Sequence, residues 1–527
     1  MDANGLLTVY AILIAALTLM SEERRADFNI RFSWLDWVIS TLPTIGILII
    51  IYSPTILTIF PITPIGWFLG FTKETAIFTL LAITLSYFSI KFIGNKVPKC
   101  NHAKFASKMT TLLKEKKFPI LAYLIDRHQA SLLTALNKEH WRNSLQRKIK
   151  PPLNFSTDQQ PSSKNNITAL TQKLFSALSH LIPKEKKSQE LLRIATKKCF
   201  KSPAFVRYLA NTHALLAARF LSTDLLLSSD EMSNIFFKYL ISTPDSILFR
   251  ELRDNQNIDY SGEIFIDENN ELLQFYLADI NVAERNKIYN PIAEHIKNNI
   301  NSNKNKDSYY NTSNENFSNS DQRWSCPIFC GIFFFQIMVS AAIFQRSKHH
   351  MWLMYYDTFA KEILSCTLRH ETVNLESEFP TKFDYLLYEI FSNTCIWVTS
   401  AIYAKNIKDS ETHPEHFAAK SVGKQFKNIF TSNKTTKIQK IYFLEALLST
   451  TEKLDFNHRN DLSSLIYDTA LARYEGGPID NFRVDRIYNF FCEIDSKYNN
   501  SISSFRSKLF QHYKKMHGLD QLTDPRN

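Results

Sequence analysis

The sequence predicts a mainly α-helical protein, in which N-terminal transmembrane helices, three of them, precede a large helical cytosolic body with at most short strands. Three observations predict this class. Three apolar stretches crowd the first 93 of the 527 residues. Glycine is scarce, with 11 residues where average usage would give roughly 37, which disfavours a Gly-rich nucleotide-binding sheet. Apolar residues in the rest of the chain recur at helical spacing.

The apolar stretches cover residues 5–20, 37–60 and 75–90. A helix that crosses the hydrocarbon core needs about 20 predominantly apolar residues, which the second stretch satisfies and the other two approach. A cleaved signal peptide is an alternative for residues 5–20. However, no Lys or Arg precedes that stretch, and "TLMSEER" is a poor cleavage sequence. We therefore predict a transmembrane anchor over residues 1–93.

The basic residues around these stretches predict the topology. Arg24, Arg25 and Arg31 follow the first stretch, whereas the second loop carries Lys73 alone, and five lysines follow within residues 91–108. Basic loops stay in the cytoplasm. We therefore expect the N-terminus outside and the C-terminal body in the cytoplasm.

Residues 94–150 form the predicted basic juxtamembrane segment. Residues 91–150 contain 14 Lys and Arg against 3 Asp and Glu, a surplus of 11 that equals the net charge of the whole chain. Apolar residues from Phe105 to Leu113 share one helical face. The other face carries Lys104, Lys108, Lys114, Lys116 and Lys117. Two interpretations remain open: binding of anionic lipid headgroups, and topological retention charge on a solvated face. Nucleic-acid binding has no supporting motif.

The cytosolic body is divided by two polar segments. Residues 151–166 form a Pro/Ser-rich linker, residues 167–300 a helical domain, residues 301–323 an Asn/Ser-rich linker that we expect to be disordered, and residues 324–527 a second helical domain. Ser228 and Glu231 have the spacing of a capping box, and residues 264–266 alternate like a short strand. The apolar residues 326–344 fit either a fourth span or a buried core helix. We favour the core helix because the next helix is apolar enough to cover it.

Motifs that carry chemistry are missing from the sequence. It contains no phosphate-binding loop, no dinucleotide-binding glycine pattern and no His-Glu-x-x-His zinc motif. We therefore predict no enzyme activity, no catalytic residue, no cofactor and no metal. The seven cysteines are irregularly spaced, which favours reduced thiols.

The sequence contains three weak groups of candidate residues. They are Cys326, Cys330, His349 and His350 as a zinc site; His413, Glu415 and His416 as a metal site; and Asp245, Glu251 and Arg253 as nuclease-like acids and a base. The cysteines lie in an apolar run, which favours inert buried thiols. Pro414 marks a helix start, so the second group favours an exposed cap. Pro244-Asp245-Ser246 is typical of a helix capped by Asp245 or Ser246.

The layout resembles the transmembrane effectors of bacterial anti-phage abortive-infection systems, including those encoded beside retron reverse transcriptases. The resemblance covers the anchor, the basic segment, the helical body and an Asn/Lys-rich composition, and no motif carries functional residues over. It implies a bacterial inner-membrane effector that is held inactive by a protein or ribonucleoprotein partner, contacts membrane lipids, can form homo-oligomers, and disrupts the membrane once released. The alternatives are a non-enzymatic scaffold that tethers a cytosolic partner, and a membrane-bound enzyme whose site is not recognised.

Overall fold

The computed structural model describes residues 8, 11, 15, 18–59, 72–94, 97–137, 187–223, 230–315, 317, 321–347, 352–369, 371, 373–403, 414–474, 476–493 and 504–519. These residues are mainly helical, as predicted. Their β structure is limited to isolated bridges. The possible strand at residues 264–266 is one such bridge, between Ile258 and Ile264. The chain divides into two compact units, the first formed by Met1–Leu209 with Arg219–Ser228 and the second by Ala210–Ala218 with Ser229–Asn527.

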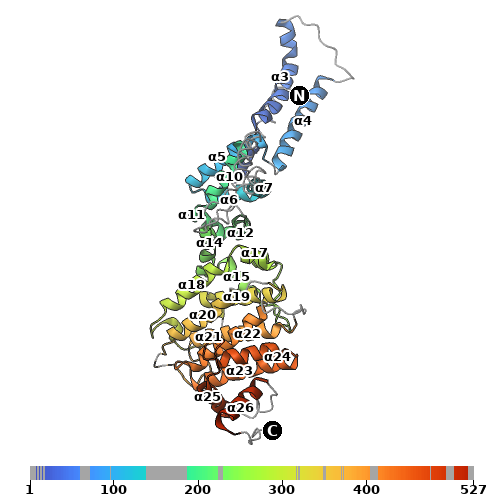
Figure 1. The fold of residues 1–527 in the computed structure, drawn as a ribbon. Coiled ribbons are helices and arrows are strands. Elements are labelled where there is room, and N and C mark those ends of the chain that lie inside the picture. The colour runs from blue at the N-terminus through green and yellow to red at the C-terminus, as the bar shows by residue number, and fades with distance from the viewer. Residues whose placement is uncertain are drawn as a thin grey trace, which may run out of the picture. The chain divides into compact units, whose positions relative to one another are not determined.

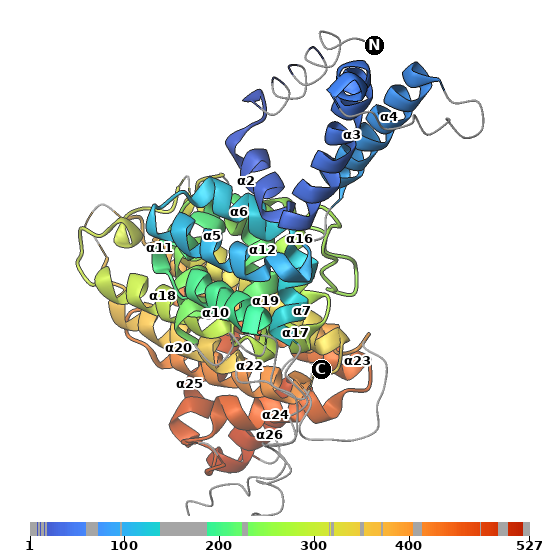
Figure 2. The ribbon, with the colours of Figure 1, turned by 90° about the horizontal axis from the view of Figure 1, so that it is seen from above.

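The first unit combines a long helical hairpin with a small helical domain (Figure 1). The hairpin consists of α3 (Trp34–Ile59) and α4 (Lys73–Ile93), which pack side by side (Figure 2). The domain contains α2 (Glu22–Arg31), η2 (Lys99–Asn101), α5 (His102–Lys114), α6 (Phe118–Arg127), α7 (Gln129–Asn137), α10 (Lys187–Phe200), most of α11 (Pro203–Thr212) and the end of α12 (Ala214–Leu221).

Helix α5 is amphipathic, as the sequence predicts, but its apolar face is covered by protein. Phe105, Met109 and Leu112 are buried, and α5 packs against α10 and α6. Helix α10 comes from the region that we expected to form a separate domain after residue 166. The two compact units therefore divide the chain differently from the expected domains, because α10 supplies the partner that the apolar face of α5 requires. The predicted linker at residues 151–166 lies outside the described residues.

The second unit is built from successive helices. It begins with α14 (Asp230–Ser242), α15 (Ile247–Asp254), α16 (Glu271–Leu277), α17 (Ile280–Arg285) and α18 (Tyr289–Ser302). It continues through η3 (Tyr309–Asn311), η4 (Asp321–Ser325), α19 (Pro327–Phe344), α20 (Leu353–Cys366) and α21 (Lys382–Ser400). It ends with α22 (Pro414–Thr431), α23 (Lys437–Phe456), α24 (Asn460–Leu471), α25 (Asn481–Glu493) and α26 (Ser504–His517).

Helix α19 is the central core helix of the second unit. It is long and apolar enough to cross a membrane, yet 83% of its apolar window is buried inside the protein. It packs against α14, α15, α18, α21 and α22. The prediction of a buried core helix for residues 326–344 agrees with this packing, because surrounding helices occupy the faces that lipid would otherwise contact.

The segment expected to be a disordered linker, residues 301–323, is largely ordered where it is described, which corrects that expectation. Asn311 donates from Nδ2 to the carbonyls of Asn305 (2.9 Å) and Cys366 (3.1 Å), and its Oδ1 accepts from the Leu368 N–H (2.9 Å). Phe317 is fully buried. The segment lacks aliphatic residues. Buried aromatic side chains and hydrogen bonds from asparagine stabilise it instead.

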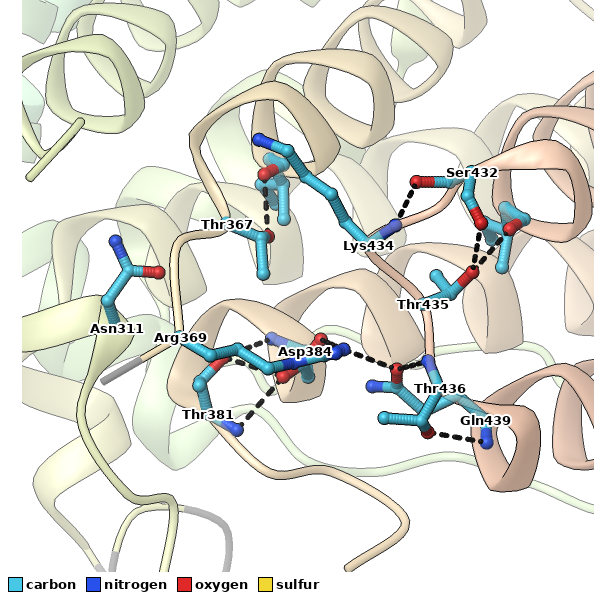
Figure 3. A network of polar contacts seen from close by, with 12 residues as sticks. Asn311, Thr367, Arg369, Thr381, Asp384, Ser432, Lys434, Thr435, Thr436 and Gln439 are labelled. Atoms are coloured by element: carbon cyan, nitrogen blue, oxygen red, sulfur yellow. Dashed lines mark hydrogen bonds and ion pairs between the residues drawn. The ribbon is translucent and has the colours of Figure 1, made fainter. Parts of the chain in front are cut away.

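A polar network joins the starts of two core helices in the second unit (Figure 3). Thr381 and Asp384 form the capping box of α21, and Thr436 and Gln439 form the capping box of α23. Arg369 donates to Oε1 of Gln439 (3.0 Å) and lies 3.7 Å from the Asp384 carboxylate. The Arg369 guanidinium therefore contacts two side chains, Asp384 and Gln439, that already take part in helix capping boxes.

Candidate functional site

The outer surface of the α3–α4 hairpin is apolar. Two segments of these helices have the length and hydropathy of a membrane span: Trp34–Tyr52 in α3 and Lys73–Lys91 in α4. In each of them, 17% of the apolar window is buried. A water-soluble protein rarely exposes so large an apolar surface. Polar side chains are satisfied within the helix, since the hydroxyls of Thr41 and Thr44 donate to carbonyls four residues earlier. These two helices are therefore long and apolar enough to cross a membrane. The expected first span, residues 5–20, lies mostly outside the described residues.

The inside of the hairpin is a narrow apolar seam. Ile47 and Ile77 are buried against each other, with Ile50, Ile51, Leu80 and Leu81 packed around them. Gly46 lies where α3 approaches α4, and a Cβ at this position would be in ordinary contact with Leu80, at 3.4 Å. Modest van der Waals packing therefore contributes to holding the middle of the hairpin together.

The base of the hairpin is joined to the small domain by buried charges. We call this cluster the base joint; it consists of Asp27, Arg31, Asp36, Lys91, Arg127 and His128. Its outer half centres on Asp36 in the first turn of α3. The Asp36 carboxylate accepts from the Ser33 N–H (2.6 Å) and hydroxyl (2.7 Å), from Lys91 Nζ (2.8 Å) and from the Tyr87 hydroxyl. Residues of α4 thus hold the start of α3.

The inner half of the base joint centres on Asp27 of α2. Its carboxylate contacts Arg31 (2.8 Å), Arg127 (2.9 Å) and Nε2 of His128 (2.7 Å). The side chains of Asp27 and His128 are almost fully buried. Three basic groups from α2, α6 and the residue after α6 therefore converge on one carboxylate.

Arg31 links the two halves of the base joint. Besides contacting Asp27, its Nη1 donates to the backbone carbonyls of Lys91 and Gly94, at the C-terminal end of α4. A cation at a helix C-terminus satisfies free carbonyls and complements the helix dipole. Asn101 supports the same corner by donating from Nδ2 to the Ile30 carbonyl (2.8 Å). The end of the membrane hairpin is thus fixed to the soluble helices by directed bonds.

The electrostatics of Asp27 favour its charged form. Burial acts to raise the pKa of the Asp27 carboxyl, but the hydrogen bond from His128 and the charges of Arg31, His128 and Arg127 outweigh burial and lower it from 3.8. A buried carboxylate with these partners stays ionised at neutral pH. The arrangement positions these charges at the base of the hairpin.

The five lysines predicted to face lipid do not behave as one group. Lys104 donates to the carbonyls of Asn29 (2.6 Å) and Phe32 (3.4 Å), so it fastens the turn between α2 and α3. Lys117 lies 3.4 Å from Glu22 and from Glu115 in exposed ion pairs. Within the described part of the chain, no side-chain hydrogen bond or ion pair involves Lys108, Lys114 or Lys116.

The base-joint residues were missed by sequence reasoning. Asp27 and Arg31 have the i, i+4 spacing of a helical ion pair, and Asp36 is an acid at the very edge of an apolar stretch. These two signals were available in the sequence. The contribution of His128 was not, because it depends on the packing of α6 against α2.

The two cysteines of the candidate zinc site have hydrogen-bond partners in and next to α19. Cys326 caps α19, since its Sγ accepts from the Phe329 N–H (3.4 Å), and Cys330 donates to the Trp324 carbonyl (3.3 Å). Burial raises the pKa of both thiols. No group of three or more potential ligands occurs among the residues that the structure describes. His349, His350 and His413 lie outside those residues.

The described residues of the other two candidate groups have structural partners. Glu415 pairs with Arg346 (2.9 Å), and His416 lies 3.7 Å from Asp461. Ser246 caps α15 by accepting from the Phe249 N–H (3.4 Å), as the helix-start interpretation predicts. The Glu251 carboxylate accepts from the N–H groups of Leu272 (3.1 Å) and Leu273 (2.8 Å) at the start of α16, so this acid completes a helix terminus.

Comparison with family models, with curated proteins and with solved structures finds no match for this chain.

Proposed function

We propose that this protein is an integral inner-membrane effector of a bacterial anti-phage defence system, which is held inactive by a partner and acts by disrupting the membrane. The observation that supports the proposal is the base joint. A passive anchor needs no defined geometry at its junction with the soluble domain. Here a buried network connects the ends of both membrane helices to α2 and α6, so a change in the soluble helices would be transmitted to the hairpin.

The proposed mechanism is a shift between two arrangements of the hairpin. A partner protein or ribonucleoprotein that binds the inactive arrangement more tightly keeps it populated, and loss of the partner releases the active one. The apolar seam around Ile47 and Ile77 is small, and the polar contacts between α3 and α4 described above lie at the base of the hairpin. In the active arrangement, the outer faces of α3 and α4 associate with other copies of the hairpin.

Membrane potential during induced expression of the full chain, without its native partner, tests the proposal. We expect depolarisation and entry of a membrane-impermeant dye. Lys91→Ala, which removes the Asp36 ion pair at 2.8 Å, should insert normally but depolarise the membrane less, because α3 is then held less firmly to α4, whose C-terminal end Arg31 joins to α2. Lys114→Ala is the matched control, since Lys114 is exposed on α5.

A scaffold that tethers a cytosolic partner predicts a different result. Expression would then leave membrane potential and dye exclusion unchanged, while a partner would co-purify with the chain. That combination, with normal insertion of the full chain, would refute the effector proposal.

A further inference from the structure

Lys440, in the first turn of α23, is a buried lysine. Its side chain is 5% exposed. It shares a helical face with Leu444 and Leu447, at i+4 and i+7, and both leucines are fully buried. Lys440 therefore lies on the side of α23 that packs into the second unit. A lysine is almost never buried to this extent unless its charge is paired.

The amine of Lys440 has no such pair. Within the described part of the chain, no hydrogen bond or ion pair involves this side chain. Lys382, which is also buried, shows the usual alternative. Its Nζ donates to the hydroxyl of Thr312 and to the carbonyl of Ser313, both at 2.8 Å. The nitrogen of Lys382 is thus occupied, whereas that of Lys440 is left without a protein acceptor.

A second cation lies near Lys440. Helix α25 packs against α23, and the charge of its Arg486 acts on Lys440. The Arg486 guanidinium lies over the buried ring of Phe430, 5.8 Å from the ring centroid, and it makes no ion pair with any residue that the structure describes. Lysine can relieve the repulsion between two unpaired cations by losing its proton, whereas arginine stays protonated in proteins.

The protonation of Lys440 agrees with this geometry. Burial and, to a lesser extent, the charge of Arg486 lower the pKa of the Lys440 ammonium from 10.5 to about 8. About a tenth of the side chain is then a free amine at pH 7, roughly two hundred times the fraction for an ordinary lysine. A desolvated amine beside another cationic group is the arrangement that activates lysine as a nucleophile.

We propose that Lys440 is a modification site, at which its amine reacts reversibly with carbon dioxide to form a carbamate that pairs with Arg486. The Nζ lone pair forms a bond to the carbon of carbon dioxide, one C=O electron pair moves onto oxygen, and the nitrogen releases a proton to water. The reverse reaction restores the amine. The inference concerns the second unit alone and does not depend on the proposed membrane function.

Two features of the site select carbon dioxide among electrophiles. The small exposed fraction of Lys440 admits a small molecule more readily than a bulky acyl donor. The product is an anion, so the reaction replaces two unpaired cations by one ion pair with charge-assisted hydrogen bonds to Arg486. An acetylated lysine, which is neutral, would leave Arg486 without a partner.

Trapping with triethyloxonium ion tests this proposal on the full chain in lipid nanodiscs, in buffer that contains isotopically labelled bicarbonate. The reagent esterifies a carbamate, and peptide mass spectrometry then locates the labelled carbon. We expect label on Lys440 and little on Lys437, an exposed lysine in the same turn of α23. Absence of label on Lys440, or equal label on both lysines, would overturn the site.

A charge variant tests the role of the second cation. Arg486→Gln should lower the labelling of Lys440 by about threefold or more, because it removes the charge that favours the free amine and stabilises the carbamate. Arg473→Gln removes an arginine that is largely exposed and is the matched control, which should be labelled as the wild type is. Equal labelling of Arg486→Gln and Arg473→Gln would overturn the assignment of Arg486 as the partner of the carbamate.

Thermal unfolding separates covalent reaction from simple ion binding. Bicarbonate should raise the melting temperature of the wild type relative to buffer free of carbon dioxide, because a ligand that binds the folded state stabilises it. Lys440→Met, which keeps the apolar stem, should show no such rise. Stabilisation of the wild type without label on Lys440 would mean that bicarbonate binds as an ion, and the carbamate would be refuted.

Discussion

At the scale of single residues, Asp27 is the residue of the base joint whose loss should cost the most unfolding free energy. Removing one partner of a buried ion pair leaves uncompensated charge and costs about 3–5 kcal/mol. We expect Asp27→Asn to destabilise the first unit by about this amount, because Arg31 and Arg127 lose their shared carboxylate. Thermal unfolding of the detergent-solubilised chain measures the effect. Asp126→Asn is the control, since Asp126 is exposed on the same helix, α6.

The pH dependence of Asp27 gives a second prediction. Its pKa is lowered from 3.8 in the folded protein. The unfolded chain therefore binds a proton at higher pH than the native state does, so the stabilisation is present above about pH 4 and is lost as pH falls through the folded pKa. We expect the wild-type melting temperature to fall below about pH 4 more steeply than that of Asp27→Asn. Parallel curves for the two proteins would contradict this account.

Glu251 is an acid to which we assign a structural role, the support of α16. It is 5% exposed and accepts two backbone N–H groups at the start of α16. Glu251→Ala leaves both donors buried without a partner and should cost about 2 kcal/mol of unfolding free energy. Glu268→Ala, at an exposed position nearby, should cost almost nothing. Equal denaturation midpoints for the two variants would show that Glu251 does not support α16.

At the scale of elements, glycines show how closely the helices of the second unit approach each other. A Cβ on Gly423 of α22 would lie 2.9 Å from the Ile466 carbonyl and 3.0 Å from the Ala470 nitrogen, both backbone atoms of α24. A Cβ on Gly331 of α19 would meet side-chain atoms alone within 4 Å, with Cδ1 of Ile296 at 2.3 Å. Overpacking against backbone costs about 1–3 kcal/mol. We therefore expect Gly423→Ala to lower stability more than Gly331→Ala, as measured by chemical denaturation.

The elements also show what the sequence could and could not predict. The α3 and α4 spans, the amphipathic α5 and the buried α19 follow from apolar length and helical periodicity, which are local properties. The ordered structure of residues 301–315 could not be predicted in this way. Asn311 is held there by hydrogen bonds with Cys366 and Leu368, more than fifty residues away. The base joint was missed for the same reason: Asp27 and His128 meet across 101 positions of sequence. Long-range polar partners leave no periodic pattern in the sequence.

At the scale of the whole molecule, the packing of the first unit predicts which segments share a side of the membrane. Helix α2 packs against α5 and α6, so we expect α2 and the residues after α4 to lie on the same side. The distribution of basic residues predicts that the shared side is the cytoplasm. Exposed cysteines make this orientation measurable.

Labelling with a membrane-impermeant maleimide tests that orientation. Of the seven cysteines, Cys100 and Cys492 are exposed and the other five are buried. In intact spheroplasts we expect no labelling of the wild type, and in inside-out vesicles we expect labelling at Cys100, because it follows α4 on the cytoplasmic side. A Lys73→Cys variant in which Cys100 and Cys492 are replaced by Ser should show the reverse pattern, since Lys73 begins α4 at the opposite end of the span. Labelling of Cys100 from outside would invert the topology. Labelling of both positions from the same side would mean that α4 does not cross the membrane, and the effector proposal, which requires a spanning hairpin, would fall with it.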